Sequence, residues 1–169
     1  AFTELAHDEC YYWLYGENAA MGYFHQPPMI GMFIKTGYSI FESELGVRLI
    51  SVLMNTLAMH LLFLLTSRKS PSLFWGIIFS TLLFNVGAWF AAPDSPLTFF
   101  AVLFVFVLQK YLKDNRWKYA VFLGIITAAL LYSKYHGILL IGAALLANLS
   151  LLKRGSFYLI LVLGVLLFI

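Results

Sequence analysis

The sequence predicts an all-α protein: a polytopic bundle of transmembrane helices with an extracytoplasmic loop that carries short interfacial helices. Three observations favour this class. Of the 169 residues, 62% are hydrophobic and only 11% are charged, whereas a soluble domain carries about 25% charged residues. Apolar runs long enough to cross a bilayer alternate with short polar turns. The positive charges fall in alternate turns, as expected of a chain that crosses a membrane repeatedly.

The two ends of the chain suggest a piece of a longer membrane protein. The first residue is alanine, and residues 159–169 stop within an apolar run. We therefore expect at least one span before residue 1. We divide the chain into an extracytoplasmic catalytic loop, residues 1–46, and a transmembrane domain, residues 47–169. The single cysteine, Cys10, excludes an internal disulfide and a cysteine-rich metal site.

Residues 1–27 form a non-spanning loop that is polar and rich in aromatic side chains. The aromatic run 11–15 indicates either an interfacial helix, since Tyr and Trp favour the headgroup level, or an aromatic core packed on neighbouring helices. Pro27 and Pro28 break regular structure and suit the start of a helix. The apolar run 29–41 is too short to cross about 30 Å of hydrocarbon, so we expect an interfacial or re-entrant helix there.

The remaining apolar runs predict the spans. We place them at residues 47–66, 73–90 and 97–112, followed by shorter runs at 119–132 and 137–152 and a last, incomplete span. The turn 91–96 reads as a helix start, with Asp94 or Ser95 as the cap and Pro96 at the first helical position.

The charges predict the orientation of these spans. Eight of the eleven Lys and Arg residues lie in three alternate loops, which the positive-inside rule assigns to the cytoplasm: Arg68, Lys69, Lys110, Lys113, Arg116, Lys118, Lys153 and Arg154. Seven of the eight acids lie on the other side: Glu4, Asp8, Glu9, Glu17, Glu42, Glu44 and Asp94. Residues 1–46, Asp94 and the 133–136 turn are thus expected on one extracytoplasmic face.

Several residues on this face suit chemistry. Asp8 and Glu9 offer carboxylates for a general base or a metal ion, although an Asp-Glu pair taken alone is more typical of a solvated loop or a first helical turn. His25 precedes Gln26 and the two prolines, and histidine binds metal or phosphate.

A second group of candidates is basic. Lys134 interrupts a long apolar region, where a lysine indicates a function by default and snorkelling is the alternative. Lys134 and His136 suit an anionic headgroup, and Arg48 is a weaker candidate of the same kind. We find no glycine-rich phosphate loop, GxSxG or HExxH motif, and no basic face for nucleic acid.

Together these motifs resemble the GT-C class of glycosyltransferases that use polyprenyl-phosphate sugars. The similarity is greatest to the bacterial branch with aminoarabinose transferase and relatives of protein O-mannosyltransferase. The matching stretches follow in order: Asp8-Glu9 before Tyr11-Tyr12, residues 22–28, residues 41–49, residues 92–97 and residues 133–137.

The resemblance implies a multi-span helical protein whose active site lies in its first large extracytoplasmic loop. It implies catalytic roles for Asp8, as the base, and for Glu9 and Asp94. Relatives carry an acid followed by His or Lys before the two prolines, where this chain has His25 and Gln26. Lys134 is then expected to take more of the phosphate-neutralising role.

The implied partners are a polyprenyl-phosphate sugar donor and membrane lipids, and no nucleic acid. A divalent metal is the cofactor that the residues leave open, with Glu9 and His25 as candidate ligands. The implied location is a bacterial inner (plasma) membrane, with the active site facing outward. Two other functions remain open: a transporter or lipid flippase, which would require charged groups near the midplane, and a non-catalytic scaffold.

Overall fold

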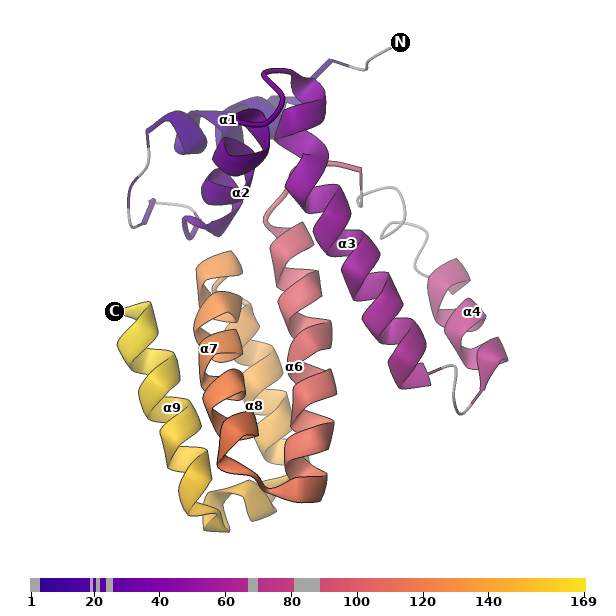
Figure 1. Ribbon diagram of the computed structural model, residues 1–169, viewed down its shortest axis with the longest axis vertical. Helices are drawn as coiled ribbons and strands as arrows, with labels where there is room; N and C mark the ends of the chain where they lie inside the picture. Colours follow the sequence, from indigo (N-terminus) through magenta and orange to yellow (C-terminus); the bar gives the residue numbers. More distant parts are fainter. Residues whose placement is uncertain (1–3, 19, 21, 24–25, 67–69, 81–88) are drawn as a thin grey trace.

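The computed structural model describes the chain except residues 1–3, 19, 21, 24–25, 67–69 and 81–88. The described part is all-α, which confirms the predicted fold class. Two short helices, α1 (His7–Glu17) and α2 (Met29–Tyr38), lie at one end of a set of longer helices (Figure 1). The longer set comprises α3 (Glu44–Thr66), α4 (Pro71–Ser80), α6 (Asp94–Asp114), α7 (Trp117–Ser133), α8 (Gly137–Ala147), the 3-10 helix η1 (Leu149–Lys153) and α9 (Gly155–Phe168).

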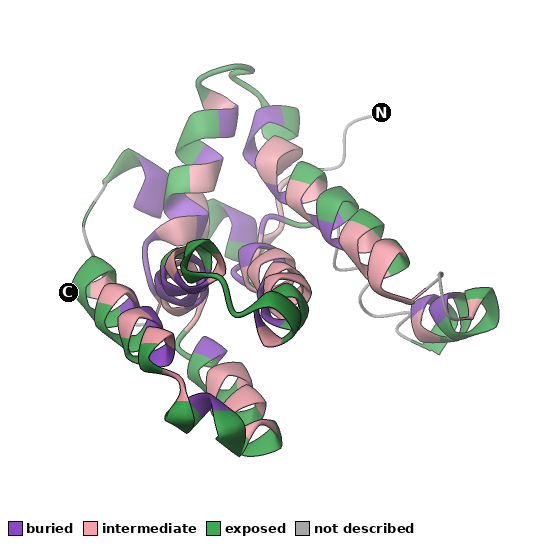
Figure 2. Ribbon diagram, turned by 60° about the horizontal axis from the view of Figure 1, so that its bottom comes forward, coloured by how far each residue is buried: buried purple, intermediate pink, exposed green. Residues whose placement is uncertain are grey.

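Among the described helices, α3 and α6 are long and apolar enough to cross a membrane. Helices α4, α7, α8 and α9 are apolar but shorter. Much of the outer surface of these helices is exposed (Figure 2). The exposed side chains include large hydrophobic ones such as Phe79, Leu139, Leu146 and Leu166. An apolar exterior of this extent suits lipid and is costly in water. The predicted spans at 47–66 and 97–112 correspond to α3 and α6, while residues 81–88 of the span predicted at 73–90 lie outside the described residues.

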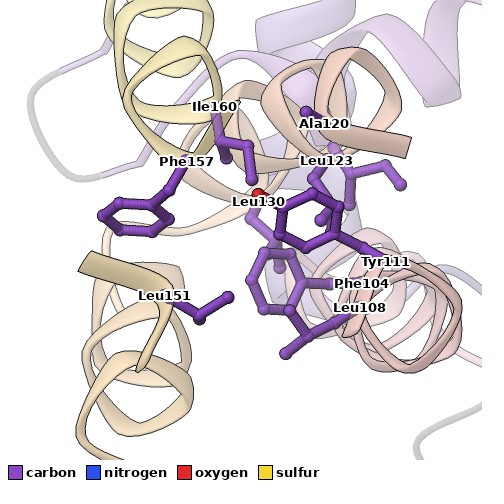
Figure 3. Packing of buried hydrophobic residues seen from close by; sticks show 10 residues of the cluster. Phe104, Leu108, Tyr111, Ala120, Leu123, Leu130, Leu151, Phe157 and Ile160 are labelled. Carbon is purple, nitrogen blue, oxygen red and sulfur yellow. The ribbon is translucent and has the colours of Figure 1, made fainter. Parts of the chain in front are cut away.

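The main core lies between α6, α7 and α9, with α8 and η1 beside it. Figure 3 shows Tyr111 and Phe104 of α6 facing Leu123 and Leu130 of α7, with Phe157 and Ile160 on α9. At the far end of this core, Arg154 donates hydrogen bonds to the carbonyl oxygens of Tyr111 and Leu112, at 3.0 and 3.2 Å. The Leu112 carbonyl is one of those that the last turn of a helix leaves without a helical partner, while the Tyr111 carbonyl also accepts the N–H of Asn115 at 2.9 Å.

A second, smaller core attaches the two short helices to the bundle. Ile30 and Ile34 of α2 are buried against Val47 of α3 and Ala91, with Tyr12 and Trp13 of α1 packed around them. One side of α1 therefore packs in a protein core. Helix α2 begins directly after Pro28, as the two prolines predict, and it ends at Tyr38, short of the predicted residue 41.

The start of α6 differs from the prediction. The cap is Pro93 and the helix begins at Asp94, with no side-chain cap and with Pro96 at the third position. Ser95 is occupied elsewhere, because its hydroxyl accepts a hydrogen bond from Asn55 of α3 at 3.0 Å and donates one to the carbonyl of Phe90 at 3.3 Å. A tertiary contact that links two helices thus replaces the local cap.

The turn between α2 and α3 depends on a close approach of backbones at Gly46. A Cβ at this position would overlap the carbonyl oxygen of Phe41 and would lie 2.9 Å from that of Gly37. We predict that Gly46→Ala lowers the free energy of unfolding by about 1–3 kcal/mol, the usual cost of overpacking. The measurement is thermal unfolding of the purified protein in detergent.

The matched control is Gly142→Ala in α8, where no atom lies within 4 Å of the added Cβ. Because Ala is favoured over Gly within a helix by about 1 kcal/mol, this variant should unfold at the parental temperature or slightly above it. Equal unfolding temperatures for the two variants would contradict the close approach at Gly46.

Candidate functional site

The first turn of α1 carries two adjacent acids that point in different directions. Successive helical residues lie about 100° apart, which follows from 3.6 residues per turn. Glu9 consequently shares a face with Trp13 and Gly16, which pack toward α2, while Asp8 lies on the neighbouring face with Tyr11, Tyr12 and Tyr15. In agreement with this pattern, Glu9 is buried and Asp8 is exposed.

The carboxylate of Glu9 is held by donors from three separate segments. Arg48 of α3 donates from Nε to Oε1 at 2.8 Å and from Nη2 to Oε2 at 2.6 Å. The N–H of Ala91 donates to Oε1 at 3.0 Å, and the N–H of Ala6 donates to Oε2 at 3.0 Å. Glu9 is only 1% exposed. We call this arrangement of Glu9, Arg48, Ala91 and Ala6 the Glu9 clasp.

The clasp determines the charge state of Glu9. Burial opposes ionisation of this carboxyl group, but the hydrogen bonds from Arg48, Ala91 and Ala6 and the attraction of Arg48 outweigh it. The pKa of Glu9 is therefore lowered from its ordinary value of 4.5. Glu9 is a fixed anion at neutral pH, and this stabilises the guanidinium that it binds in turn.

A second ion pair lies at the same end of the bundle. Lys134, at the end of α7, donates from Nζ to Oδ1 of Asp94, at the start of α6, over 2.8 Å. The side chain of Asp94 is 67% exposed and that of Lys134 is 23% exposed. A largely exposed pair of this kind contributes at most about 1 kcal/mol to stability, and the Asp94 carboxylate is open to solvent while Lys134 is only partly exposed.

The charges of Asp8 and Asp94 both influence the hydroxyl group of Tyr12. Burial raises the pKa of the Tyr12 hydroxyl, and the negative charges of Asp8 and Asp94 raise it further. Two carboxylates from distant parts of the sequence therefore act on one phenol. Within the part of the chain that the structure describes, no side chain forms an ion pair or hydrogen bond with Asp8.

The other predicted residues lie in different surroundings. His136 is exposed and occupies the N-cap position of α8, where its side chain makes no capping hydrogen bond. Gln26 is half-buried, and its backbone carbonyl accepts a hydrogen bond from the Tyr23 N–H at 3.3 Å. His25 lies outside the described residues. Arg48 directs two donors to Glu9 and one, Nη2, to the carbonyl of Glu4 at 3.0 Å.

Glu9 was one of the two candidate metal ligands. Both carboxylate oxygens accept two hydrogen bonds each, and the side chain is closed off from solvent. A metal ion would have to replace these donors, so Glu9 does not fit the role of a ligand. Among the described residues, no group of three His, Cys, Asp or Glu side chains is placed to hold a metal ion.

Sequence reasoning did not identify two members of this region. The Ala91 N–H is a backbone group, and no side-chain pattern marks it as the partner of a residue 82 positions earlier. Tyr12 was named in the aromatic run and in the motif that follows Asp8 and Glu9, but it was given no role of its own. Its spacing of four residues from Asp8 is the signal that places it on the Asp8 face of a helix.

The fold and site define a class: a helical membrane protein with two acid–base ion pairs, Glu9–Arg48 and Asp94–Lys134, at one end of its bundle. Within that class, the chain belongs to the dolichyl-phosphate-mannose-protein mannosyltransferase family, whose model matches residues 25–169. This confirms the predicted GT-C resemblance. The match begins after α1, so it does not include Asp8 or Glu9.

One relative among curated proteins is an uncharacterised protein of Aquifex aeolicus (strain VF5). It is 32% identical over 93 residues, which cover 52% of this chain and 19% of that protein. The chain thus spans about a fifth of the length of the curated relative that it matches. No solved structure matches the chain.

The Glu9 clasp predicts that single and double substitutions lower the free energy of unfolding by amounts that do not add. Arg48→Ala leaves a buried carboxylate without its cation, which typically costs about 3–5 kcal/mol. The double variant Glu9→Gln/Arg48→Ala removes both charges and should recover part of that loss. Thermal unfolding of the parent, both single variants and the double variant forms the cycle that isolates the pair. Strictly additive effects would contradict a direct Glu9–Arg48 interaction.

The lowered pKa of Glu9 also predicts a pH dependence. Because the folded value lies below the ordinary 4.5, the contribution of ionised Glu9 to stability is complete above that pH. It is lost as the pH falls through the lower folded value. The unfolding temperature of the parent should therefore fall more steeply below pH 4.5 than that of Glu9→Gln. Parallel curves for the two proteins would show that Glu9 does not titrate as stated.

Proposed function

We propose that this chain is part of a membrane glycosyltransferase that moves a sugar from a polyprenyl-phosphate donor to a lipid, glycan or protein acceptor. The reaction would take place at the extracytoplasmic face. Membership of the mannosyltransferase family supports the donor class. The observation that carries the proposal is the position of α1, which holds the exposed Asp8, at the end of the bundle where α6 begins with Asp94, the partner of Lys134 (Figure 1).

In the proposed reaction, Asp8 is the general base. An acceptor hydroxyl oxygen forms a bond to the anomeric carbon while the bond from that carbon to the phosphate oxygen breaks. The hydroxyl proton passes to Asp8, and the polyprenyl phosphate leaves with the electron pair of the broken bond. Phosphate is a good leaving group, so a strong general acid is not required. A positioned carboxylate base contributes about 100-fold to 10,000-fold to such a step.

Lys134 is proposed to stabilise the negative charge on the departing phosphate, since a preorganised cation is effective where charge develops. Asp94 would hold Lys134 in position through the 2.8 Å contact. His136 and Gln26 remain candidates for the phosphate, together with His25. For Glu9 and Arg48 we propose a positioning role, because each engages the other.

A transporter or lipid flippase is the second hypothesis. It would place charged groups along a path near the middle of the spans. The two ion pairs of the described region that involve these candidates, Glu9–Arg48 and Asp94–Lys134, instead use residues at helix ends. Their position favours chemistry at the membrane surface.

Asp8→Asn tests the proposed base. The substitution keeps the size of the side chain and removes its ability to accept a proton, so we expect transfer from a polyprenyl-phosphate sugar to fall by about 100-fold or more. The measurement is sugar transfer by the full-length protein in membranes or detergent. The control is Glu17→Gln, which neutralises an exposed acid at the other end of α1. Near-parental transfer by Asp8→Asn would remove Asp8 as the base.

The orientation can be tested with the natural cysteine. Cys10 is exposed on α1, so a membrane-impermeant thiol reagent should label it in intact cells. In Cys10→Ser/Lys113→Cys, the new thiol lies in the last turn of α6, which the charge pattern assigns to the cytoplasm. That variant should be labelled only after the membrane is permeabilised. Labelling of Lys113→Cys but not of Cys10 in intact cells would reverse the orientation.

A further inference from the structure

The face of α1 that carries Asp8 also carries an aromatic cluster. Asp8, Tyr11, Tyr12 and Tyr15 are separated by three, one and three residues, which aligns them along one side of a helix. The rings of Tyr11 and Tyr15 have centroids 4.8 Å apart, and those of Tyr11 and Tyr12 are 5.5 Å apart. Tyr11 therefore lies one turn from the exposed carboxylate, with aromatic neighbours on its inner side.

Tyr15 contacts both the hydroxyl and the ring of Tyr11. The hydroxyl of Tyr15 donates to the hydroxyl of Tyr11 at 2.6 Å, and the ring of Tyr23 stacks on Tyr15 at 3.7 Å. The hydroxyl of Tyr23 in turn donates to the carbonyl of Tyr15 at 2.6 Å. This chain of contacts joins the loop after α1 to the helix and limits the movement of the rings.

Exposure distinguishes the members of the cluster. Tyr11 is 41% exposed, whereas Tyr15 is 8% exposed. Burial, followed by the hydrogen bond and charge of Tyr11, raises the pKa of Tyr15 well above its ordinary range. Tyr15 is thus a neutral support, and Tyr11 is the member that combines access, a fixed ring and closeness to Asp8.

An exposed aromatic ring beside a carboxylate suits a carbohydrate. The C–H groups of a sugar form an apolar patch that packs on the electron-rich face of an aromatic ring. Carboxylates accept hydrogen bonds from hydroxyl groups. Tyr11 and Asp8 offer both features one helical turn apart.

We propose that Tyr11 is the stacking surface for the sugar ring of the lipid-linked donor and places the anomeric carbon near the acceptor hydroxyl at Asp8. This inference rests on the proposed function. The competing role for Tyr11 is that of a tyrosine anchored among lipid headgroups. The two roles differ in one respect: stacking requires the sugar, whereas anchoring affects any lipid alike.

The experiment compares two ligands, a polyprenyl-phosphate sugar and the same polyprenyl phosphate without the sugar. Binding of each is measured directly to the full-length protein in detergent, and transfer is measured in parallel. The variants are Tyr11→Leu, which removes the ring, and Tyr11→Phe, which keeps it. Leu14→Ala is the control for an exposed position on another face of α1.

For Tyr11→Leu we expect affinity for the sugar-bearing lipid to fall by about threefold to tenfold, as aromatic contacts predict. Affinity for the sugar-free lipid should not change. KM for the donor should rise by a similar factor, while KM for the acceptor stays near the parental value. Leu14→Ala should match the parent in both ligands. Tyr11→Phe keeps the ring but loses the hydroxyl that Tyr15 bonds, so it should retain most of the affinity for the sugar-bearing lipid that Tyr11→Leu loses.

Three outcomes would overturn the proposal. Equal losses for both lipids in Tyr11→Leu would assign Tyr11 to lipid anchoring. No loss for either lipid would remove Tyr11 from the site, and a rise in acceptor KM alone would assign it to the acceptor. A parent protein that binds neither lipid and transfers no sugar would instead contradict the proposed function itself, which keeps the two failures distinct.

Discussion

A buried carboxylate requires partners, and the whole polar end of this protein depends on how Glu9 meets that requirement. An isolated charge removed from water is very costly unless it is paired and hydrogen-bonded. Glu9 obtains its donors from Arg48 of α3, from the Ala91 N–H and from its own helix start at Ala6. Arg48 and Ala91 are far from Glu9 in sequence, so satisfying one side chain brings α1, α3 and the segment before α6 to one place.

The position of the proposed chemistry follows from this constraint. With Glu9 turned inward, the helical period directs Asp8 and Tyr11 to an accessible face. Ala91 precedes Asp94 by three residues, so the contact that Ala91 makes with Glu9 also helps to place Asp94 and, through it, Lys134. The two adjacent acids of α1 thus have different roles. Glu9 attaches the helix to the bundle, and Asp8 has no side-chain partner within the described structure. This difference is also the reason that we assign the base to Asp8 rather than Glu9.

The departures from the sequence-based elements have local physical causes. The aromatic run 11–15 was left open between an interfacial helix and a packed core, and α1 has features of both, since Trp13 and Tyr12 enter the smaller core while Tyr11 and Leu14 stay exposed. Asp94 and Ser95 were expected to cap α6, but Ser95 bonds Asn55 across the helix pair. The apolar run 137–152 is broken at Asn148, where α8 gives way to η1. In each case a contact with another helix, or an amide in an apolar run, outweighed the local pattern.

The sequence by itself determined the helical class, the approximate positions of α3 and α6, and the residue types available for chemistry, because hydrophobic run length and charge placement act locally along the chain. It also indicated the family through the order of short motifs. Only the tertiary structure decided which acid is buried, which cation Glu9 binds, and that Lys134 reaches Asp94. Such pairings join residues about 40 positions apart or more, and they follow from the packing of helices against one another, which no local pattern encodes.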